Sequence, residues 1–371
     1  MSRFKNFLWE AGLLLATTIG AGVFAIPYTF SKSGWLLGIL YISLASSLIF
    51  SVHLIYWQVL RRADHKGKLL GLIRKHFGKA GYYSAFLIII GGLTLTLVVY
   101  LILARGFIAL IFPEAGMKEF ILFWLISSLP IILSLKRLIP LELLGAVLMA
   151  GIILFIFVTA PTYGILERVP AFNFKNILLP FSPIIFALAG WTAIPTIYEY
   201  AKKTKSLGAR PPARALLAGT FFAATLYVIF TFAILGSTKT ITPDAISGLG
   251  GWPSWKLALL GALGLFAIWT SYVPIGLEIK SSLEESLKWS KNWSFSLVLF
   301  LPIALLLLGL NNFLAVMSLV GGVFLGLQHW FIVSLGRKVL SLPKGGKVFS
   351  NFLAIVFVLA AVYEVYRFVI N

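Results

Sequence analysis

The chain has 371 residues, of which 60% are hydrophobic and 12% are charged, and its mean hydropathy is +0.97. A soluble protein carries about 25% charged residues and cannot bury this much apolar surface in its own core, so the composition excludes a water-soluble domain. The formal charge is +19 and cysteine is absent, which excludes disulfides, thiolate metal sites and cysteine nucleophiles.

Long apolar runs follow one another along the chain. A helix crosses the hydrocarbon layer with about 20 residues, whereas a membrane β-barrel would show alternating segments of about ten. The first run has no A-x-A-type cleavage site and contains Gly20, Gly22 and Pro27, so we expect a span and not a signal peptide. The sequence predicts an all-α polytopic membrane protein. Its eleven predicted spans are 8–30, 34–60, 82–112, 119–135, 141–160, 177–200, 213–236, 256–279, 293–309, 313–335 and 349–370.

The basic residues indicate which way the spans run. Of the 31 Lys and Arg residues, 23 lie in connections that share one side of the membrane when the spans alternate in direction. Because basic loops stay in the cytoplasm, we expect a cytoplasmic N-terminus, an extracytoplasmic C-terminus and residence in the cell (inner) plasma membrane. The positive charge is therefore interpreted as a topology signal and not as a nucleic-acid site. The connections on that side are 1–7, 61–81, 136–140, 201–214, 280–292 and 336–348.

A short motif occurs twice. Residues 22–27 (GVFAIP) and 190–195 (GWTAIP) share the pattern G-x-x-A-I-P at an offset of 168 residues, in the first and sixth spans. Gly and Pro interrupt helices, and backbone freed inside a membrane must line a cavity or be buried in protein. Matching interruptions in two halves indicate the binding site of a transporter. The alternative is chance similarity between two Gly-rich packing helices.

The spacing predicts two inverted repeats of five helices followed by one additional helix. An odd number of spans separates the two copies, so the second enters the membrane from the opposite side. The corresponding domains are 1–160, 161–336 and 337–371.

Four stretches carry a family resemblance. Residues 15–28 (LATTIGAGVFAIPY) resemble the first helix of the amino acid–polyamine–organocation superfamily. Within it, the chain is most similar to the hydroxy/aromatic amino acid permeases and the amino acid/auxin permeases. Residues 183–198, 266–271 (FAIWTS) and 318–324 (SLVGGVF) resemble the sixth, eighth and tenth helices. The resemblance implies the LeuT fold, with the first and sixth helices broken, alternating access and an amino acid substrate.

A bound amino acid requires donors for its carboxylate and acceptors for its ammonium group. Free N–H groups and a positive dipole end begin the second half of the broken first helix, and free carbonyls end the first half of the sixth. Trp191 could form a wall of the side-chain pocket, and Thr94 and Thr96 of the third span are weaker candidates. Alternatively, Thr17 and Thr18 bond back to their own helix and Trp191 only packs. The candidate substrate-binding residues are Thr17, Thr18, Gly20, Ala21, Gly22, Tyr100, Phe186, Ala187, Leu188, Gly190 and Trp191.

A coupling ion is also implied. In the sodium transporters that the chain resembles, a sodium ion lies between the first and eighth helices. The positions matching that site are the carbonyls of Ala16, Ile19 and Ala267 and the hydroxyls of Thr270 and Ser271. Hard oxygen ligands suit sodium, and we expect no other cofactor. Proton coupling is the alternative.

We expect a symporter of a neutral amino acid, with aromatic ones among the candidates. It would work in the lipid bilayer as a monomer or weak oligomer. A non-transporting amino acid sensor on the same fold is a further alternative. The sequence lacks the metalloprotease, serine-hydrolase and Walker motifs, which argues against an enzyme.

Overall fold

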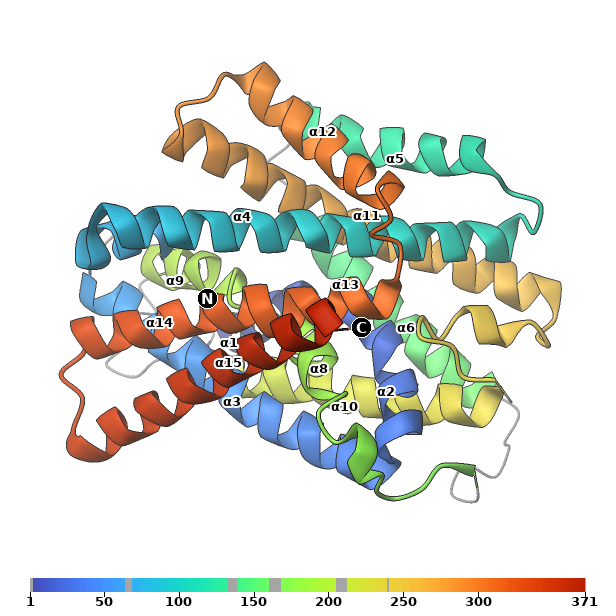
Figure 1. Cartoon of the computed structure of the whole chain (residues 1–371), viewed down its shortest axis with the longest axis horizontal. Helices are drawn as coiled ribbons and strands as arrows, with labels where there is room; N and C mark the ends of the chain where they lie inside the picture. The colour runs from blue at the N-terminus through green and yellow to red at the C-terminus, as the bar shows by residue number, and fades with distance from the viewer. Residues whose placement is uncertain are drawn as a thin grey trace.

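The computed structural model describes residues 3–63, 69–132, 139–159, 168–204, 212–238 and 240–370. All regular structure in these ranges is helical, as Figure 1 shows, which confirms the predicted all-α fold. The predicted boundary between the two repeats, 160/161, lies outside the described residues.

Two long helices form the centre of one group. α4 (Leu69–Ile111) and α11 (Ser254–Ser286) lie side by side along the long axis of the molecule (Figure 1). α5 (Met117–Ile132) and α12 (Lys291–Leu307) pack against both of them on one side. α4 is kinked at Gly78, whose φ of 71° favours glycine. These four helices are the third, fourth, eighth and ninth predicted spans.

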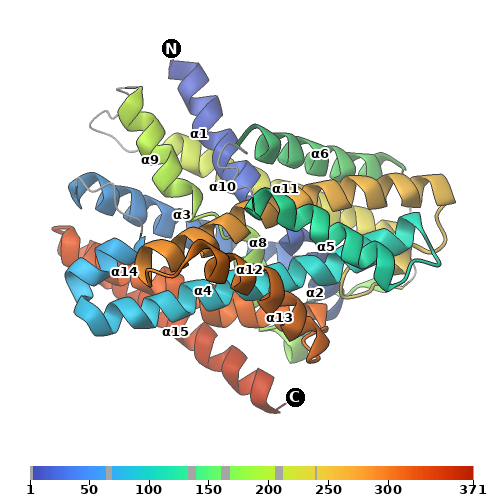
Figure 2. The ribbon, with the colours of Figure 1, turned by 90° about the horizontal axis from the view of Figure 1, so that it is seen from above.

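A second group surrounds the first span. α1 (Arg3–Thr18) packs against α10 (Ala213–Ser237) and α6 (Ile139–Thr159). α10 in turn contacts α3 (Trp35–Ala63). Figure 2 shows the N-terminus at the free end of α1, far from the C-terminus.

The first span is broken. After α1 the chain passes through the extended residue Gly20 (φ −157°, ψ −153°) into the 3-10 helix η1 (Ala21–Ala25) and then α2 (Ile26–Ser33). The two halves are bent by 53° relative to each other. Pro27 lies in the first turn of α2, where its missing N–H has no helical partner to lose. The repeated motif therefore begins just after the break, as its glycine and proline predict.

The sixth span is broken at the equivalent place. α8 (Phe181–Leu188) ends at Ala189, whose ψ of 103° is not helical, and α9 (Ala193–Lys203) begins after the turn at 190–192. Both broken spans match the LeuT fold that the resemblance implied. The inverted symmetry of the two halves stays a prediction.

The tenth span contains a π-helix. α13 (Phe313–Leu319) continues through the π segment η4 (Val320–Leu325) into α14 (Gly326–Val339). Gly322 leaves room for the side chains of Ser182 and Glu364. The predicted eleventh helix is α15 (Lys344–Ile370), which packs along α14 and η4. The short 3-10 helices η2 (Phe174–Asn176) and η3 (Ser247–Leu249) lie in connections.

The described helices overlap all eleven predicted spans. Seven of them, counting α8–α9 and α13–α14 as one span each, are long and apolar enough to cross a membrane, and the bent first pair makes up to eight. The segments 143–159 of α6 and 291–307 of α12 are apolar but shorter, and α5 has 16 residues. The chain is thus a multi-pass membrane protein, and the crossings of its three shorter helices stay predictions.

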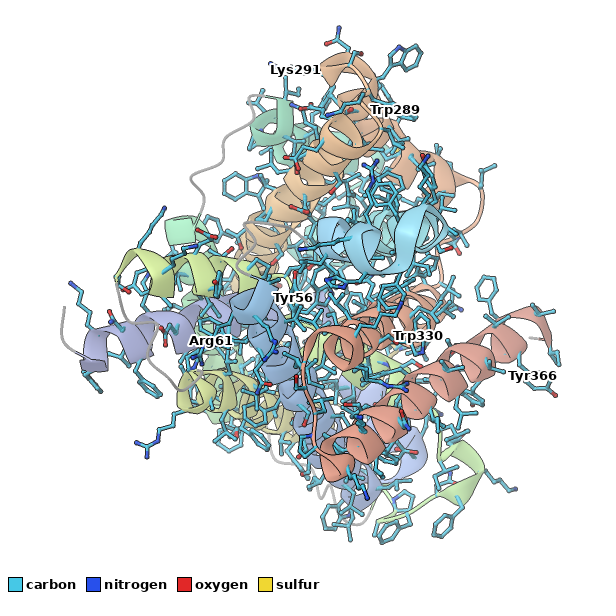
Figure 3. The ribbon with its side chains drawn as sticks, turned by 90° about the vertical axis from the view of Figure 1, so that its left-hand side faces the viewer. Tyr56, Arg61, Trp289, Lys291, Trp330 and Tyr366 are labelled. Atoms are coloured by element: carbon cyan, nitrogen blue, oxygen red, sulfur yellow. The ribbon has the colours of Figure 1, made fainter. Side chains whose placement is uncertain are left out.

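The outer surface is apolar, as a lipid-facing surface requires. Leu87 of α4, Val147 of α6 and Leu359 of α15 are each more than 60% exposed. The interior is aromatic: Tyr56 of α3 lies fully buried in the centre of Figure 3, whereas Tyr366 lies at its rim. The core between the two helix groups surrounds the cavity described next.

Candidate functional site

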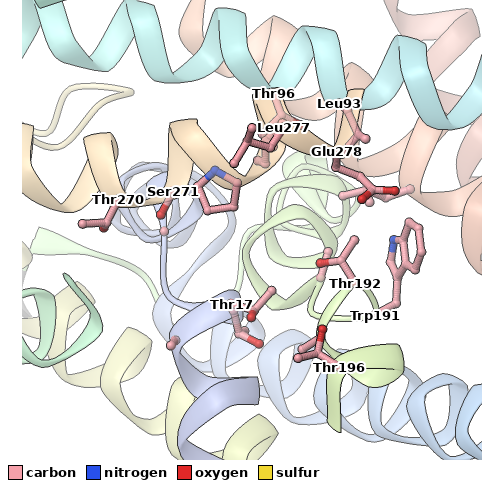
Figure 4. A pocket seen from close by; sticks show the side chains of 18 of the residues that line it. Thr17, Leu93, Thr96, Trp191, Thr192, Thr196, Thr270, Ser271, Leu277 and Glu278 are labelled. Atoms are coloured by element: carbon pink, nitrogen blue, oxygen red, sulfur yellow. The ribbon is translucent and has the colours of Figure 1, made fainter. Parts of the chain in front are cut away.

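A cavity of about 630 Å³ lies where the two broken helices meet α4 and α11. Figure 4 shows Trp191 at one end of this cavity, Thr270 and Ser271 at the other, and Thr17 of α1 between them. Most of the sequence-predicted residues line it: Ala16, Thr17, Thr18, Ile19, Gly20, Ala21, Gly22, Tyr100, Phe186, Trp191, Ala267, Thr270 and Ser271. The other three predicted residues, Ala187, Leu188 and Gly190, are buried and are not among the lining residues.

The break in the first span presents backbone to the cavity. Gly20 is extended, and a Cβ there would lie 3.3 Å from the Tyr100 hydroxyl and 4.0 Å from the Ser271 hydroxyl oxygen. Gly20 therefore leaves an approach to the backbone between these two hydroxyl groups. Gly22 has a different role, because a Cβ there would lie 2.6 Å from the Cβ of Ala187. It lets the two broken helices pack backbone to backbone.

Both threonines of α1 bond to their own helix. Thr17 donates to the Leu13 carbonyl at 3.0 Å, and Thr18 donates to the Leu14 carbonyl at 2.8 Å. This is the alternative that the sequence left open. Each hydroxyl oxygen keeps its lone pairs, so it can still accept a bond from a ligand.

The ends of α1 and α8 share one donor. The fully buried Tyr227 hydroxyl of α10 is 2.8 Å from the Thr18 carbonyl oxygen and 2.8 Å from the Ala187 carbonyl oxygen. Gly190, at the second break, packs against Thr18, since a Cβ there would lie 2.5 Å from the Thr18 hydroxyl oxygen. Tyr227 and Gly190 thus hold the two breaks together behind the cavity.

Trp191 is fixed at the far end of the cavity. Its indole Nε1 donates to the Gln328 side-chain oxygen of α14 at 2.9 Å. Its ring meets that of Tyr56 edge to face, with centroids 6.2 Å apart. Phe186, Ile89 and Leu93 add apolar side chains to the lining, and the carboxylate of Glu278 faces the cavity beside Trp191 (Figure 4). Trp191 is both a packing residue and a cavity wall.

The α11 hydroxyls lie at the opposite end. Thr270 and Ser271 both donate to the Ala267 carbonyl, at 2.8 and 3.2 Å. The two differ in direction: Ser271 faces Gly20, whereas Thr270 packs against Gly145 of α6. These hydroxyls and the backbone oxygens of the first break supply the ligand type that a hard cation needs. No group of three His, Asp or Glu residues suited to a metal ion occurs in the described ranges.

The cavity is closed on the side of Gly22 and reaches the surface along α11. Beyond Gly22, the buried rings of Phe24, Phe107 and Phe230 pack edge to face, with centroids 5.2 and 5.4 Å from that of Phe24. In the other direction the lining follows α11 to Glu278 and the exposed Glu285. The predicted topology places that open end in the cytoplasm.

Sequence reasoning missed several lining residues. Gln328 and Tyr56 support Trp191, and Thr192, Thr196 and Glu278 also face the cavity (Figure 4). Gln328 had a visible signal, because it is a polar residue in an apolar span, two residues after the last glycine of that span. Of the weaker candidates, Thr96 lines the cavity and donates to the Gly92 carbonyl at 2.8 Å, whereas Thr94 is outside the lining.

Comparison with known proteins adds a family match. The model of the family described as transmembrane amino acid transporter protein matches residues 7–234. The search of curated proteins found no match.

Solved structures of transporters share the fold. MhsT in complex with L-phenylalanine is 17% identical, with a TM-score of 0.68, covering 99% of this chain and 98% of its own. The Eremococcus coleocola manganese transporter, in complex with an aromatic bis-isothiourea compound, is 12% identical (TM-score 0.69, 98% and 86% covered). Mhp1, a nucleobase-cation-symport-1 family transporter with bromovinylhydantoin bound, is 15% identical (TM-score 0.61, 97% and 89% covered). At these identities the likeness concerns the fold alone.

Proposed function

This chain belongs to the transmembrane amino acid transporter family, and on that premise we propose that it is a symporter of a neutral amino acid. It is accordingly a transporter-family protein and not an enzyme. The observation that supports the substrate class is the meeting of two helix breaks at one cavity that is closed beyond Gly22. In this proposal the carboxylate binds at the backbone of Gly20 and Ala21, where N–H groups and a helix dipole favour an anion.

The ammonium group has its acceptors on the same side of the cavity. The hydroxyl oxygens of Thr17 and Thr18 keep lone pairs, and carbonyls end α8 near Phe186. The substrate side chain then points toward Trp191, Phe186 and Tyr56. The rings of these three residues give a large neutral side chain an apolar surface to pack on, beside the Glu278 carboxylate that also faces this end (Figure 4). An aromatic amino acid is the first candidate, and MhsT, which shares the fold, was solved with L-phenylalanine.

Sodium is the proposed coupling ion. Ser271 faces the first break beside Gly20, where the carbonyls of Ala16 and Ile19 end α1. In this structure Thr270 packs against Gly145 of α6, so its hydroxyl joins the proposed site only after its side chain rotates. In this proposal the N-terminus is cytoplasmic, the membrane is the plasma membrane and the protein works as a monomer or weak oligomer.

A proton is the second candidate ion. The buried His53 and His329 lie near each other in α3 and α14, and both are fully buried. Both histidines lie outside the cavity lining, and the acids that do line it, Glu278, Glu284 and Glu285, lie toward its open end on α11, which favours sodium. Measuring amino acid flux across the membrane distinguishes a transporter from a sensor that binds the amino acid without transporting it.

The test is counterflow in proteoliposomes. Vesicles loaded with unlabelled L-phenylalanine should transiently accumulate external labelled L-phenylalanine above equilibrium. In vesicles without internal substrate, net uptake should require an inward sodium gradient. Binding without accumulation would identify a sensor. Accumulation that follows a pH gradient in sodium-free buffer would identify proton coupling.

A further inference from the structure

Gln328 is a fully buried polar side chain that reaches the cavity from α14. Its side-chain oxygen accepts from the Trp191 indole at 2.9 Å, and its Nε2 donates to the Ile88 carbonyl of α4 at 3.3 Å. Only 1% of the residue is exposed. One amide thus joins three parts of the chain: α14, the second helix break and α4.

The surrounding backbone makes room for this amide. A Cβ on Gly92 of α4 would lie 2.8 Å from Gln328 Nε2 and 2.8 Å from the Cβ of Phe324. The π segment η4 immediately precedes α14 and adds residues to its turn, which changes the direction of the side chains that follow. Leu325 and Gln328 both face the cavity as a result. π segments occur frequently at functional sites.

We propose that Gln328 is a positioning residue that sets substrate specificity by holding the Trp191 ring as a rigid wall of the side-chain subsite. This inference rests on the proposed function and adds the element that selects the side chain. With its N–H bonded to Gln328 and its ring edge to face with Tyr56, the indole has one orientation. A large apolar side chain then packs against a preformed surface, and no affinity is lost in ordering the wall.

The consequence is a difference between ligands. When the amide is removed, Trp191 becomes free to rotate, and a ligand that packs on it loses affinity. L-alanine has no side chain long enough to need this wall. A merely structural role of Gln328 would instead weaken every amino acid to the same degree, so the ratio of two affinities reports on specificity.

The experiment measures the dissociation constants of L-phenylalanine, L-leucine, L-alanine and L-lysine by calorimetry on the purified full chain. The variants are Gln328→Met, which keeps the shape without the amide, Trp191→Phe, and the double variant. We expect the phenylalanine-to-alanine affinity ratio to fall about fivefold to tenfold in Gln328→Met, the size of one hydrogen bond. Alanine affinity should change less than about twofold. The double variant should fall no further than Trp191→Phe, because both changes remove the same bond.

Two further variants test the proposed role of Gln328. Gln328→Glu, when protonated, can accept from Trp191 and donate to Ile88, and should retain most of the ratio. Gly92→Ala pushes on the amide from the opposite side and should lower the ratio in a chain that keeps Gln328, so the test stands even if Gln328→Met fails to fold.

Two results would overturn the inference: equal weakening of all ligands, or additive effects in the double variant. Failure of the proposed function looks different, because the wild type would then bind none of the four amino acids or would prefer L-lysine over L-phenylalanine. If the wild type binds L-phenylalanine and folded Gln328→Met keeps the same ratio, only the role of Gln328 is wrong.

Discussion

The hydroxyl of Tyr227 lies 2.8 Å from the carbonyl oxygen of Ala187, at the point where α8 ends. The same hydroxyl is 2.8 Å from the Thr18 carbonyl, so a single proton serves the ends of both broken helices. Carbonyls at a helix end have no partner within the helix, and here both are buried. A side chain of α10 therefore holds together the two breaks that form the cavity wall.

Tyr227→Phe should destabilise the protein and impair transport together. It removes the donor from two buried carbonyls, and a buried unsatisfied group costs about 1–3 kcal/mol. We expect a lower Tm and slower L-phenylalanine uptake in proteoliposomes. Tyr83→Phe is the matched control, because Tyr83 is 55% exposed on α4 and the same change there should leave both values intact. A Tyr227→Phe variant with wild-type Tm would show that the two carbonyls find other donors.

The two glycines of the first break should respond differently to alanine. A Cβ on Gly22 would meet the backbone and side chain of Ala187, and neither can move aside without shifting α8. Gly22→Ala should therefore lower the Tm. A Cβ on Gly20 would meet only two side-chain hydroxyl oxygens, that of Tyr100 at 3.3 Å and that of Ser271 at 4.0 Å. Gly20→Ala should therefore fold.

Gly20→Ala should nevertheless weaken amino acid binding, because the added methyl group occupies the approach to the backbone N–H groups. Thermal unfolding and calorimetry on both variants measure the two effects separately. Unchanged affinity for L-phenylalanine in Gly20→Ala would place the carboxylate elsewhere in the cavity.

The hydroxyls of α11 provide a test of sodium coupling. Ser271→Ala and Thr270→Ala each remove one proposed ligand, and we expect each to raise the sodium concentration for half-maximal uptake several-fold. Ser281→Ala is the control, since this hydroxyl also lines the cavity on α11 and bonds its own helix, at 3.2 Å from the Glu278 carbonyl. Its sodium dependence should equal that of the wild type. If all three variants keep the sodium concentration for half-maximal uptake of the wild type, there is no sodium site at this end of α11.

Local chemistry in the sequence predicted much of this architecture. Apolar runs of membrane length predicted the helices, and Gly20, Gly22 and Pro27 predicted the first break, because each acts on the backbone where it stands. The same reasoning found the second break at Gly190. Glu364 and Arg367, three residues apart on α15, share one face of the helix and form an ion pair at 3.6 Å.

Contacts between segments that are far apart in the chain could not be predicted from the sequence. The Ser182 hydroxyl of α8 donates to Glu364 at 2.7 Å across 182 residues, and Gln328 reaches Trp191 across 137. Such pairs depend on how helices pack, and a single sequence contains no periodicity that specifies them. For the same reason, the direction of Thr270 toward α6 could not be distinguished from that of its neighbour Ser271.

The absence of cysteine allows the open end of the cavity to be located directly. Thr196 of α9 is exposed to the cavity, and Ser247 of η3 is exposed at the opposite end of the chain's long helices. In the cysteine-free background, Thr196→Cys should react with a membrane-impermeant maleimide from the cytoplasmic face only. Ser247→Cys should react from the outer face only, which checks the predicted orientation.

L-phenylalanine should slow labelling of Thr196→Cys and leave Ser247→Cys unaffected, because only the first thiol lies beside the proposed substrate. Labelling of Thr196→Cys from the outer face in resting vesicles would contradict either the closure by Phe24, Phe107 and Phe230 or the predicted topology. The Ser247→Cys result distinguishes these two cases, because an inverted topology would move its labelling to the cytoplasmic face.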